Sequence, residues 1–334
     1  MLHDRVVSKK IIGGGSNSKV FKLTCRDGTV YAGKMYFRSP EDFRNRLETE
    51  FGGVTFLRRN GVRNIPVPVK SNNAMRCAVY EFIHGVKIPF RKIGKKEIDS
   101  AVGFLKKLKK VSRVKESETI GDASEACFSL KDILDNLEFR LERLIGVPKI
   151  STISKELHDF LRNSFIPSYR EIVKWSVEFC KKRGMDEPIN RCAQTLSPSD
   201  FGFHNALLDG EGELIFLDFE YFGWDDPAKM ISDFLLHPGM SLNNDVKRYF
   251  ADEVFFCFSE GVELIRDRTE AVYPLFGLKW CLILLNEFVQ DDILRRNFAG
   301  KAYNLEEQQM IQLNKTKKML KKVIEEHGKF PYSR

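Results

Sequence analysis

Three oxygen-bearing side chains in residues 196–218 have an order and spacing that suit phosphoryl transfer. Asp200 precedes Asn205 by five positions in "SDFGFHN", and Asp218 closes the apolar run "LIFLD". The pattern between Asn205 and Asp218 predicts a β-hairpin, which would place both residues at its open end. One carboxylate and one amide oxygen are ligands that Mg²⁺ accepts beside phosphate oxygens. Asp200 could take the proton of a substrate hydroxyl. Singly, the three could be a helix cap, a turn residue and a solvated strand end.

A glycine-rich segment could bind nucleotide phosphates. In "IIGGGSNSKVFKL", Gly13 and Gly15 fit a G-x-G-x-x-G pattern in which Ser18 replaces the last glycine. Without Cβ atoms, the backbone can approach phosphate oxygens and direct N–H groups at them. An ordinary turn between two strands is the alternative. The candidate nucleotide-contacting residues here are Gly13, Gly14, Gly15 and Ser16.

A lysine and a glutamate further along the chain are expected to pair. Lys34 lies in the strand-like run "YAGKMY", where a buried ammonium needs an anionic partner unless its head reaches solvent. Glu50 lies on the apolar stripe of the next predicted helix, so it faces the sheet. Such a pair would hold the lysine where it can meet phosphates. Gly52 and Gly53 in this helix indicate close backbone packing or a break. The apolar stripe consists of Phe43, Leu47, Val54 and Leu57.

The elements that position these residues predict two lobes. Residues 1–85 read as a small antiparallel sheet, with a hairpin at Asp27-Gly28 and one helix opening at Ser39-Pro40. Residues 86–334 are mainly helical in periodicity and contain the hairpin that ends at Asp218. This α+β arrangement suggests a ligand cleft between a nucleotide-binding lobe and a lobe with the catalytic loop and acceptor pocket.

Composition is that of an ordinary globular protein. The chain has 334 residues, 43% of them hydrophobic and 30% charged, and a net charge of +8. Seven scattered cysteines without a C-x-x-C pair argue against a zinc site and predict a cytoplasmic location. The apolar stretch around Lys279 and Glu287 is expected to be a buried helix. The basic run at 106–115 is read as an exposed helix face, with a nucleic-acid patch as the alternative, so neither a nucleic-acid nor a membrane partner is expected.

The motifs together resemble those of the aminoglycoside phosphotransferase and choline kinase family. "GGGSNSKVFKL", "AGKMY", "ETEF", "VYEFIHG", "SDFGFHN", "LDFE" and "GWDDPA" follow one another in family order over nearly the whole chain. The combination of D-x-x-x-x-N, a hydrophobic strand ending in D-[FW]-[ED], and G-x-x-D-P is specific, whereas the glycine-rich loop alone is not. The resemblance implies a two-lobed protein-kinase-like fold and a small-molecule kinase.

The resemblance also implies roles for the residues introduced above. Asp200 would be the catalytic base, while Asn205 and Asp218 would hold Mg²⁺. Lys34 and Glu50 would form the ion pair that positions the phosphates of ATP. The backbone at Glu81 and Ile83 would meet the adenine ring.

The acceptor is expected to be a small molecule. Asp226-Pro227 follows Asp218 almost at once, which leaves no room for the peptide platform of a protein kinase. Carboxylates and aromatic rings near the metal site suit an amine, a quaternary ammonium or a polyol, so the expected acceptor is a sugar, an amino sugar or an amino alcohol. Core packing is the alternative for the tryptophans, and His204 and His237 are read as structural. The candidate acceptor contacts are Glu220, Trp224, Asp225 and Glu287.

Two departures from the family pattern affect the functional prediction. Pro198 stands where the family usually has a histidine before the catalytic aspartate, and Met230 stands where many relatives have an aspartate. Pro198 gives weight to a second hypothesis, a nucleotide-binding scaffold without catalysis. The presence of Lys34, Asp200 and Asp218 favours the enzyme. The sequence does not determine the oligomeric state or the acceptor.

Overall fold

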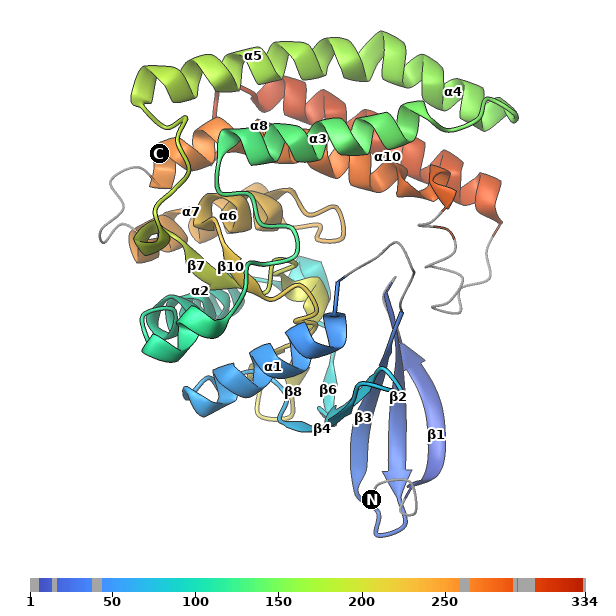
Figure 1. Ribbon diagram of the computed structural model, residues 1–334, viewed down its shortest axis with the longest axis vertical. Helices are drawn as coiled ribbons and strands as arrows, with labels where there is room; N and C mark the ends of the chain where they lie inside the picture. The colour runs from blue at the N-terminus through green and yellow to red at the C-terminus, as the bar shows by residue number, and fades with distance from the viewer. Residues whose placement is uncertain are drawn as a thin grey trace. The chain divides into compact units, whose positions relative to one another are not determined.

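Five strands at the start of the chain form an antiparallel sheet in the computed structural model, which describes residues 6–13, 17–37, 44–258, 265–290, 293 and 304–332 (Figure 1). The strand order is β1-β2-β3-β5-β4. The expected turn at Asp27-Gly28 joins β2 to β3, and Gly28 has the positive φ of +84° that this turn needs. The strands are β1 (Val6–Gly13), β2 (Ser18–Cys25), β3 (Val30–Tyr36), β4 (Pro68–Asn72) and β5 (Cys77–Glu81).

Helix α1 (Arg46–Arg59) follows this sheet. Its N-cap is Asn45, whose side chain accepts a hydrogen bond from the backbone N–H of Glu48 at 3.4 Å. Within the described residues the helix begins at Arg46 after this cap, and the expected opening at Ser39-Pro40 lies outside the described residues. Its buried face carries Leu47, Glu50, Gly53, Val54 and Leu57, as the apolar spacing predicts.

A second, three-stranded sheet contains the predicted hairpin. It has the order β6-β8-β9, and β8 and β9 pair from Ala206↔Phe216 to Leu208↔Leu214. Helix α2 packs on this hairpin through Phe104, whose ring stacks on that of Phe216 at a centroid distance of 4.4 Å. The elements are β6 (Gly85–Val86), α2 (Lys95–Val111), β8 (Ala206–Asp209) and β9 (Leu214–Phe216), with β7 (Thr195–Ser197) paired to β10 (Gly223–Asp225).

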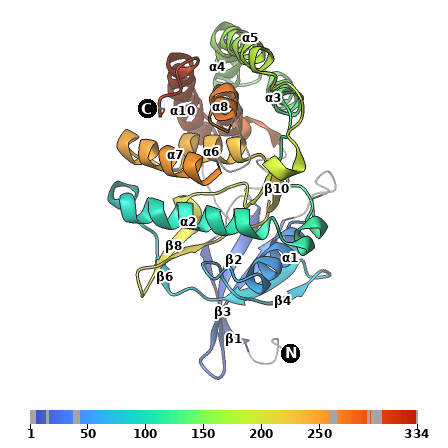
Figure 2. The same cartoon turned by 90° about the vertical axis from the view of Figure 1, so that its left-hand side faces the viewer.

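The remaining helices pack around α8. Figure 2 shows α10, α3 and α6 around α8, and these helices contact it directly. Ile265–Phe288 is long and apolar enough to cross a membrane by composition, but 78% of its most apolar window is buried inside the protein, as expected for a core helix. The helices are α3 (Leu130–Ile145), α4 (Thr152–Phe160), α5 (Ile166–Arg183), α6 (Pro227–Leu236), α7 (Asn244–Phe258), α8 (Ile265–Leu284) and α10 (Leu305–Glu326).

The described residues divide into two compact units. Unit 1 takes its residues from Met1–Glu125 and Leu196–Trp224, and unit 2 from Ala126–Thr195, Asp225–Leu294 and Ala302–Arg334. The expected lobes instead divide the chain after residue 85, and that boundary stays a prediction. The α+β fold class, with an antiparallel sheet first and helices later, is confirmed.

Candidate active site

Lys34 lies at the centre of a cluster of three carboxylates in unit 1. Its Nζ atom is 2.7 Å from Glu50 Oε2, 2.6 Å from Asp218 Oδ1 and 3.7 Å from Glu220 Oε2. The lysine, Glu50 and Glu220 are buried, whereas the Asp218 side chain is about one third exposed. The expected pair of Lys34 and Glu50 is therefore present, and Asp218 joins it from a segment far along the chain.

The strands and α1 explain how this cluster is assembled. Alternation along β3 turns Lys34 and Tyr36 to one face of the sheet, where both are buried. The Tyr36 hydroxyl lies 2.9 Å from both Glu50 Oε2 and the Tyr80 hydroxyl. The other Glu50 oxygen, Oε1, accepts a hydrogen bond of 3.4 Å from the backbone N–H of Phe219. Glu50 thus links β3, α1 and the segment that follows the hairpin.

The cluster keeps its lysine charged. Burial alone would lower the pKa of Lys34, but Asp218, Glu50 and Glu220 together raise that pKa well above its ordinary value. Burial raises the pKa of Glu220 to about 7, with repulsion from Asp218 adding to the effect and Lys34 opposing it. Burial also raises the pKa of Glu50 against the opposing effect of Lys34. One ammonium facing three carboxylates leaves the cluster with excess negative charge, which suits a cation.

The cluster could hold a divalent cation. One oxygen each from Glu50, Asp218 and Glu220 lies within 4.8 Å of the others, a spacing that a metal ion can bridge. The Oε2 atom of Glu220 is buried without a hydrogen-bond partner. Oxygen donors of this type are those that Mg²⁺ prefers, so the residues fit the group that the sequence predicted. Sequence reasoning assigned Glu220 to the acceptor; the structure places it in the Lys34 cluster.

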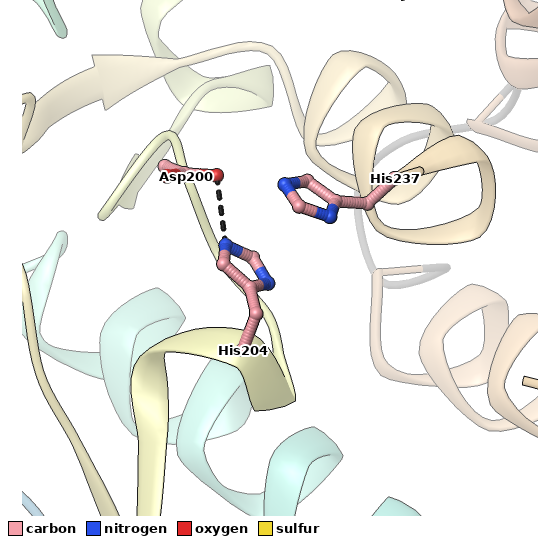
Figure 3. Close-up of side chains that lie close together, drawn as sticks. All are labelled: Asp200, His204 and His237. Atoms are coloured by element: carbon pink, nitrogen blue, oxygen red, sulfur yellow. Dashed lines mark hydrogen bonds and ion pairs between the residues drawn. The ribbon is translucent and has the colours of Figure 1, made fainter. Parts of the chain in front are cut away.

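Asp200 lies on a strained turn after β7. Its backbone N–H donates to the carbonyl of Pro198 at 2.9 Å around Ser199, whose φ is +66°, the geometry of an uncommon γ-turn. The Asp200 side chain is 35% exposed, and its Oδ1 lies 3.0 Å from His204 Nε2 (Figure 3). The side-chain amide of Asn205 donates to Asp200 Oδ2 at 3.2 Å. Two neighbours thus orient this carboxylate while leaving it accessible to a substrate.

His204 is a residue whose position sequence reasoning missed. The interpretation of His204 as structural overlooked that it follows Asp200 by four positions. This spacing is the signal that could have indicated the contact between the two side chains. The usual family histidine precedes the aspartate, and Pro198 stands there instead. The histidine that contacts the aspartate in this chain follows it.

Asn205 and Asp218 lie at the same end of the hairpin, as predicted. The backbone N–H of Leu217 donates to the carbonyl of Asn205 at 2.8 Å, which joins the two ends of the hairpin. Asp218 itself has a φ of +67°, an uncommon conformation for a residue other than glycine. This backbone turn directs the Asp218 carboxylate to Lys34. Their roles as metal ligands stay predictions.

The glycine-rich segment contributes a residue that was not predicted. Asn17 is buried, and its amide nitrogen donates to Glu220 Oε1 at 2.5 Å and to the Tyr221 hydroxyl at 2.6 Å. Gly13 ends β1 in the described part of the chain. Gly14, Gly15 and Ser16 lie outside the described residues, so their phosphate contacts stay predictions.

The predicted adenine contacts lie at and just beyond the end of β5. The Glu81 backbone N–H donates to the Val67 carbonyl at 2.8 Å, and its carboxylate accepts from the Val67 N–H at 3.0 Å. Ile83 is half-buried in the connection between β5 and β6. Adenine binding by the backbone at Glu81 and Ile83 stays a prediction.

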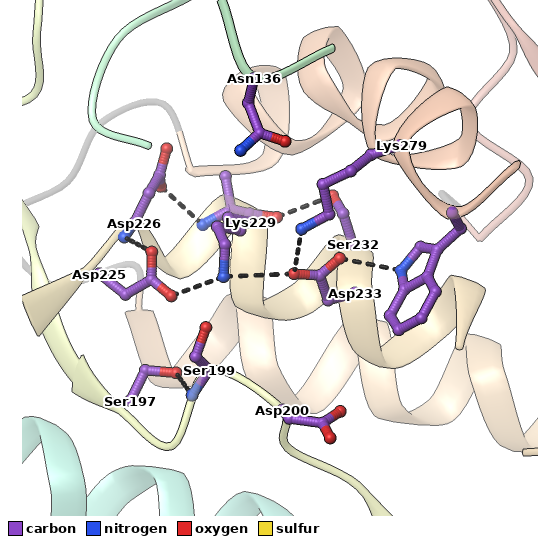
Figure 4. A network of polar contacts seen from close by, with 12 residues as sticks. Asn136, Ser197, Ser199, Asp200, Asp225, Asp226, Lys229, Ser232, Asp233 and Lys279 are labelled. Carbon is purple, nitrogen blue, oxygen red and sulfur yellow. Dashed lines mark hydrogen bonds and ion pairs between the residues drawn. The ribbon is translucent and has the colours of Figure 1, made fainter. Parts of the chain in front are cut away.

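The other predicted acceptor residues are buried and have internal partners. The Trp224 indole N–H donates to the Ser117 carbonyl at 3.0 Å within unit 1. In unit 2, Asp225 forms an ion pair of 2.7 Å with Lys229, and both side chains are fully buried (Figure 4). Glu287 is also buried. These contacts give Trp224 and Asp225 structural roles, and acceptor binding by any of them stays a prediction.

Asp226 caps α6. Its Oδ1 accepts from the Ala228 backbone N–H at 2.8 Å, directly before Pro227 at the first helical position. Its Oδ2 accepts from Arg268 Nε of α8 at 2.7 Å, a partner that the sequence did not reveal. The cap and the ion pair together fix the start of α6.

The fold is shared with known small-molecule kinases. No family model and no curated protein matches the sequence. An ethanolamine kinase from Plasmodium vivax has a TM-score of 0.61 at 14% identity, covering 95% of this chain and 84% of that one. A spectinomycin phosphotransferase solved with ADP and spectinomycin has a TM-score of 0.61 at 12% identity, covering 93% of this chain and 96% of that one. A choline kinase from Streptococcus pneumoniae has a TM-score of 0.59 at 14% identity, covering 95% of this chain and 94% of that one. At these identities the likeness shows the protein-kinase-like fold that the motifs predicted.

Proposed function

We propose that this protein transfers the terminal phosphoryl group of ATP to a hydroxyl of a small molecule, such as a sugar, an amino sugar or an amino alcohol. The observation that carries the proposal is the buried Lys34 held by Glu50 and Asp218, because this arrangement presents a fixed cation to nucleotide phosphates. The shared fold with kinases of ethanolamine, choline and aminoglycosides supports it.

The Lys34 cluster would hold the nucleotide. Lys34 would contact phosphate oxygens, with Glu50 fixing its ammonium. Asp218, Asn205 and Glu220 offer oxygen ligands for Mg²⁺, which would neutralise charge on the phosphates when bound. The glycine-rich segment from Gly13 to Ser16 would supply backbone N–H groups, and the backbone at Glu81 and Ile83 would meet adenine.

Asp200 would act as the general base. A substrate hydroxyl would donate its proton to a carboxylate oxygen of Asp200 as the hydroxyl oxygen bonds to the γ-phosphorus and ADP leaves. His204 and Asn205 hold the carboxylate in one orientation, so little reorganisation is needed. The exposed third of the side chain leaves room for an acceptor.

The short connection after Asp218 supports a small acceptor. Helix α6 begins at Pro227, so only a few residues separate Asp218 from the next helix. A protein substrate would need a longer segment to lie on. A hydroxyl carried by a compact molecule needs no such platform.

The test is Asp200→Asn, assayed for both nucleotide binding and acceptor-stimulated ADP release across a library of alcohols. We expect Mg-ATP binding to stay within about twofold while turnover falls by roughly 10²–10⁴. Asp135→Asn makes the same change on the exposed face of α3 and should alter neither quantity. Equal losses of binding and turnover would remove Asp200 from the role of base. Tight Mg-ATP binding by the wild-type chain without turnover on any alcohol would favour a nucleotide-binding scaffold.

A further inference from the structure

Positive charge is concentrated in one segment that the proposed reaction does not use. Residues 87–115 contain eleven lysines and arginines and two acidic residues, a net charge of +9. The whole chain has a net charge of +8, so the rest of the protein carries −1. The basic character of the protein therefore comes entirely from this segment.

The structure gathers much of this charge on one face of α2. The opposite face, which includes Ile98, Leu105 and Leu108, is buried in unit 1. A helix of 17 residues is about 25 Å long, and its exposed lysines lie in the first turn and the last two turns, with the exposed Asp99 between them. Lys107 also bonds the Asn64 side chain, and Lys96 approaches the Gly212 carbonyl at 3.5 Å. The basic face consists of Lys95, Lys96, Lys106, Lys107 and Lys110, all exposed.

Exposed apolar side chains lie at the start of this segment. Val86 of β6 is 66% exposed, Pro89 is exposed, and Ile88 and Phe90 are half-buried. Strand β6 pairs with β8, and the turn after β8 contains the Gly212 carbonyl that Lys96 approaches, so these residues adjoin the first turns of α2 (Figure 2). We call Val86–Phe90 the apolar loop. Lys87, Arg91 and Lys92 flank or interrupt it, and all three are exposed.

We propose that the basic face and the apolar loop together form a surface that docks on anionic lipid membranes. The apolar side of α2 is buried in the protein, so the helix would bind by charge attraction to lipid headgroups and not by insertion. The apolar loop would enter the boundary between headgroups and acyl chains. Val86, Ile88 and Pro89 carry no aromatic ring on which a base could stack, and Phe90 is half-buried, which favours lipid over nucleic acid as the occupant.

This inference goes beyond the proposed function and does not depend on it. It departs from the sequence expectation of no membrane partner, which read the basic run at 106–115 as an exposed helix face only. The structure shows exposed lysines on one face of α2 and exposed apolar residues just before this helix.

Sedimentation of the full chain with lipid vesicles tests the proposal. We expect binding to vesicles of phosphatidylcholine with phosphatidylserine, no binding to phosphatidylcholine alone, and weaker binding as salt rises. The double variant Lys106→Gln, Lys110→Gln should lose about 25-fold in affinity, roughly fivefold for each lost cation near the surface. The matched control Lys149→Gln, Lys155→Gln removes two exposed lysines of unit 2 and should bind within about twofold of the wild type. Equal losses in the two double variants would overturn the proposal.

A second variant separates lipid from nucleic acid. Val86→Thr keeps the shape of the exposed side chain but makes it polar, and should weaken vesicle binding severalfold. Duplex DNA that binds more tightly than the phosphatidylserine vesicles, with loss in the lysine variant but not in Val86→Thr, would assign the surface to nucleic acid and overturn the proposal. No binding of the wild-type chain to the mixed vesicles at low salt would overturn it as well.

Discussion

Removal of the Lys34 ammonium tests the electrostatics of the candidate site most directly. In Lys34→Met, Glu50, Asp218 and Glu220 remain close together without a cation, and two of the three carboxylates are buried. We expect the variant to unfold more easily than the wild type in the absence of divalent ions, because an uncompensated buried charge is costly.

The magnitude follows from the two short contacts of Lys34. At an effective dielectric constant of about 20, charges 2.7 Å and 2.6 Å apart each attract by about 6 kcal/mol. Desolvation of the ammonium and carboxylates offsets much of this attraction. Removing one partner of a buried pair costs about 3–5 kcal/mol in measured cases, and we expect a loss in this range. For a chain of 334 residues, with an unfolding entropy of about 2.1 cal/mol/K per residue, that corresponds to a fall of about 4–7 °C in Tm.

The assay is thermal and urea unfolding with a chelator present, in a double-mutant cycle. Glu50→Gln removes the charge of one of the two carboxylates that contact Lys34 most closely. The double variant Lys34→Met, Glu50→Gln should therefore be destabilised by about 2 kcal/mol less than the sum of the losses in the two single variants. Lys10→Met, on the exposed strand β1, is the matched control and should stay within about 0.5 kcal/mol of the wild type. Added Mg²⁺ should stabilise Lys34→Met more than it stabilises the wild type.

Two results would refute this reasoning. A loss below about 1 kcal/mol in Lys34→Met would mean that the carboxylates take up protons or water at little cost, so that the cluster is not a charged site. Additive single losses in the cycle would mean that Lys34 and Glu50 do not act as a pair.

Two further predictions concern packing and pH. Gly53→Ala should lower the free energy of unfolding by about 1–3 kcal/mol, because its Cβ would lie 2.4 Å from Phe222 Cδ1. Gly52→Ala, in open space on the same helix, should raise that free energy by up to about 1 kcal/mol. Equal free energies of unfolding in urea for the two variants would contradict this contrast. Burial lowers the pKa of Lys247 to about 8, so the folded protein loses this proton before the unfolded chain does. The free energy of unfolding should therefore receive a stabilising contribution from Lys247 as pH rises from about 8 to 10.5. Urea unfolding of Lys247→Met across that range should show no such increase.

Much of the site could be predicted because its signals are local. The helical spacing of Glu50 placed it on the buried side of α1, and alternation in β3 placed Lys34 on the facing side of the sheet. The turn between β8 and β9 is short, so the ends of that hairpin had to meet. Asp226 before Pro227 is a capping pattern readable from neighbouring residues alone.

The contacts that were missed join distant segments. Asn17 and Glu220 are 203 residues apart, and no periodicity links a glycine-rich turn to the segment after a hairpin. Arg268 reaches Asp226 from another helix, and nothing in either local pattern indicates the other. The ion pair of Asp225 with Lys229 joins residues only four apart, but its complete burial comes from how α6 packs in the fold.

The sequence by itself determined the order of the motifs, the strand and helix periods and thus which side chains face inward. Only the tertiary structure decided that Glu220 joins the Lys34 cluster and that Asn17 donates a hydrogen bond to it. The physical reason is that periodicity sets the direction of a side chain within its own element, while its partner depends on how elements pack. Uncommon backbone angles at Ser199 and Asp218 then aim the carboxylates, and such angles persist only where the surrounding fold holds them.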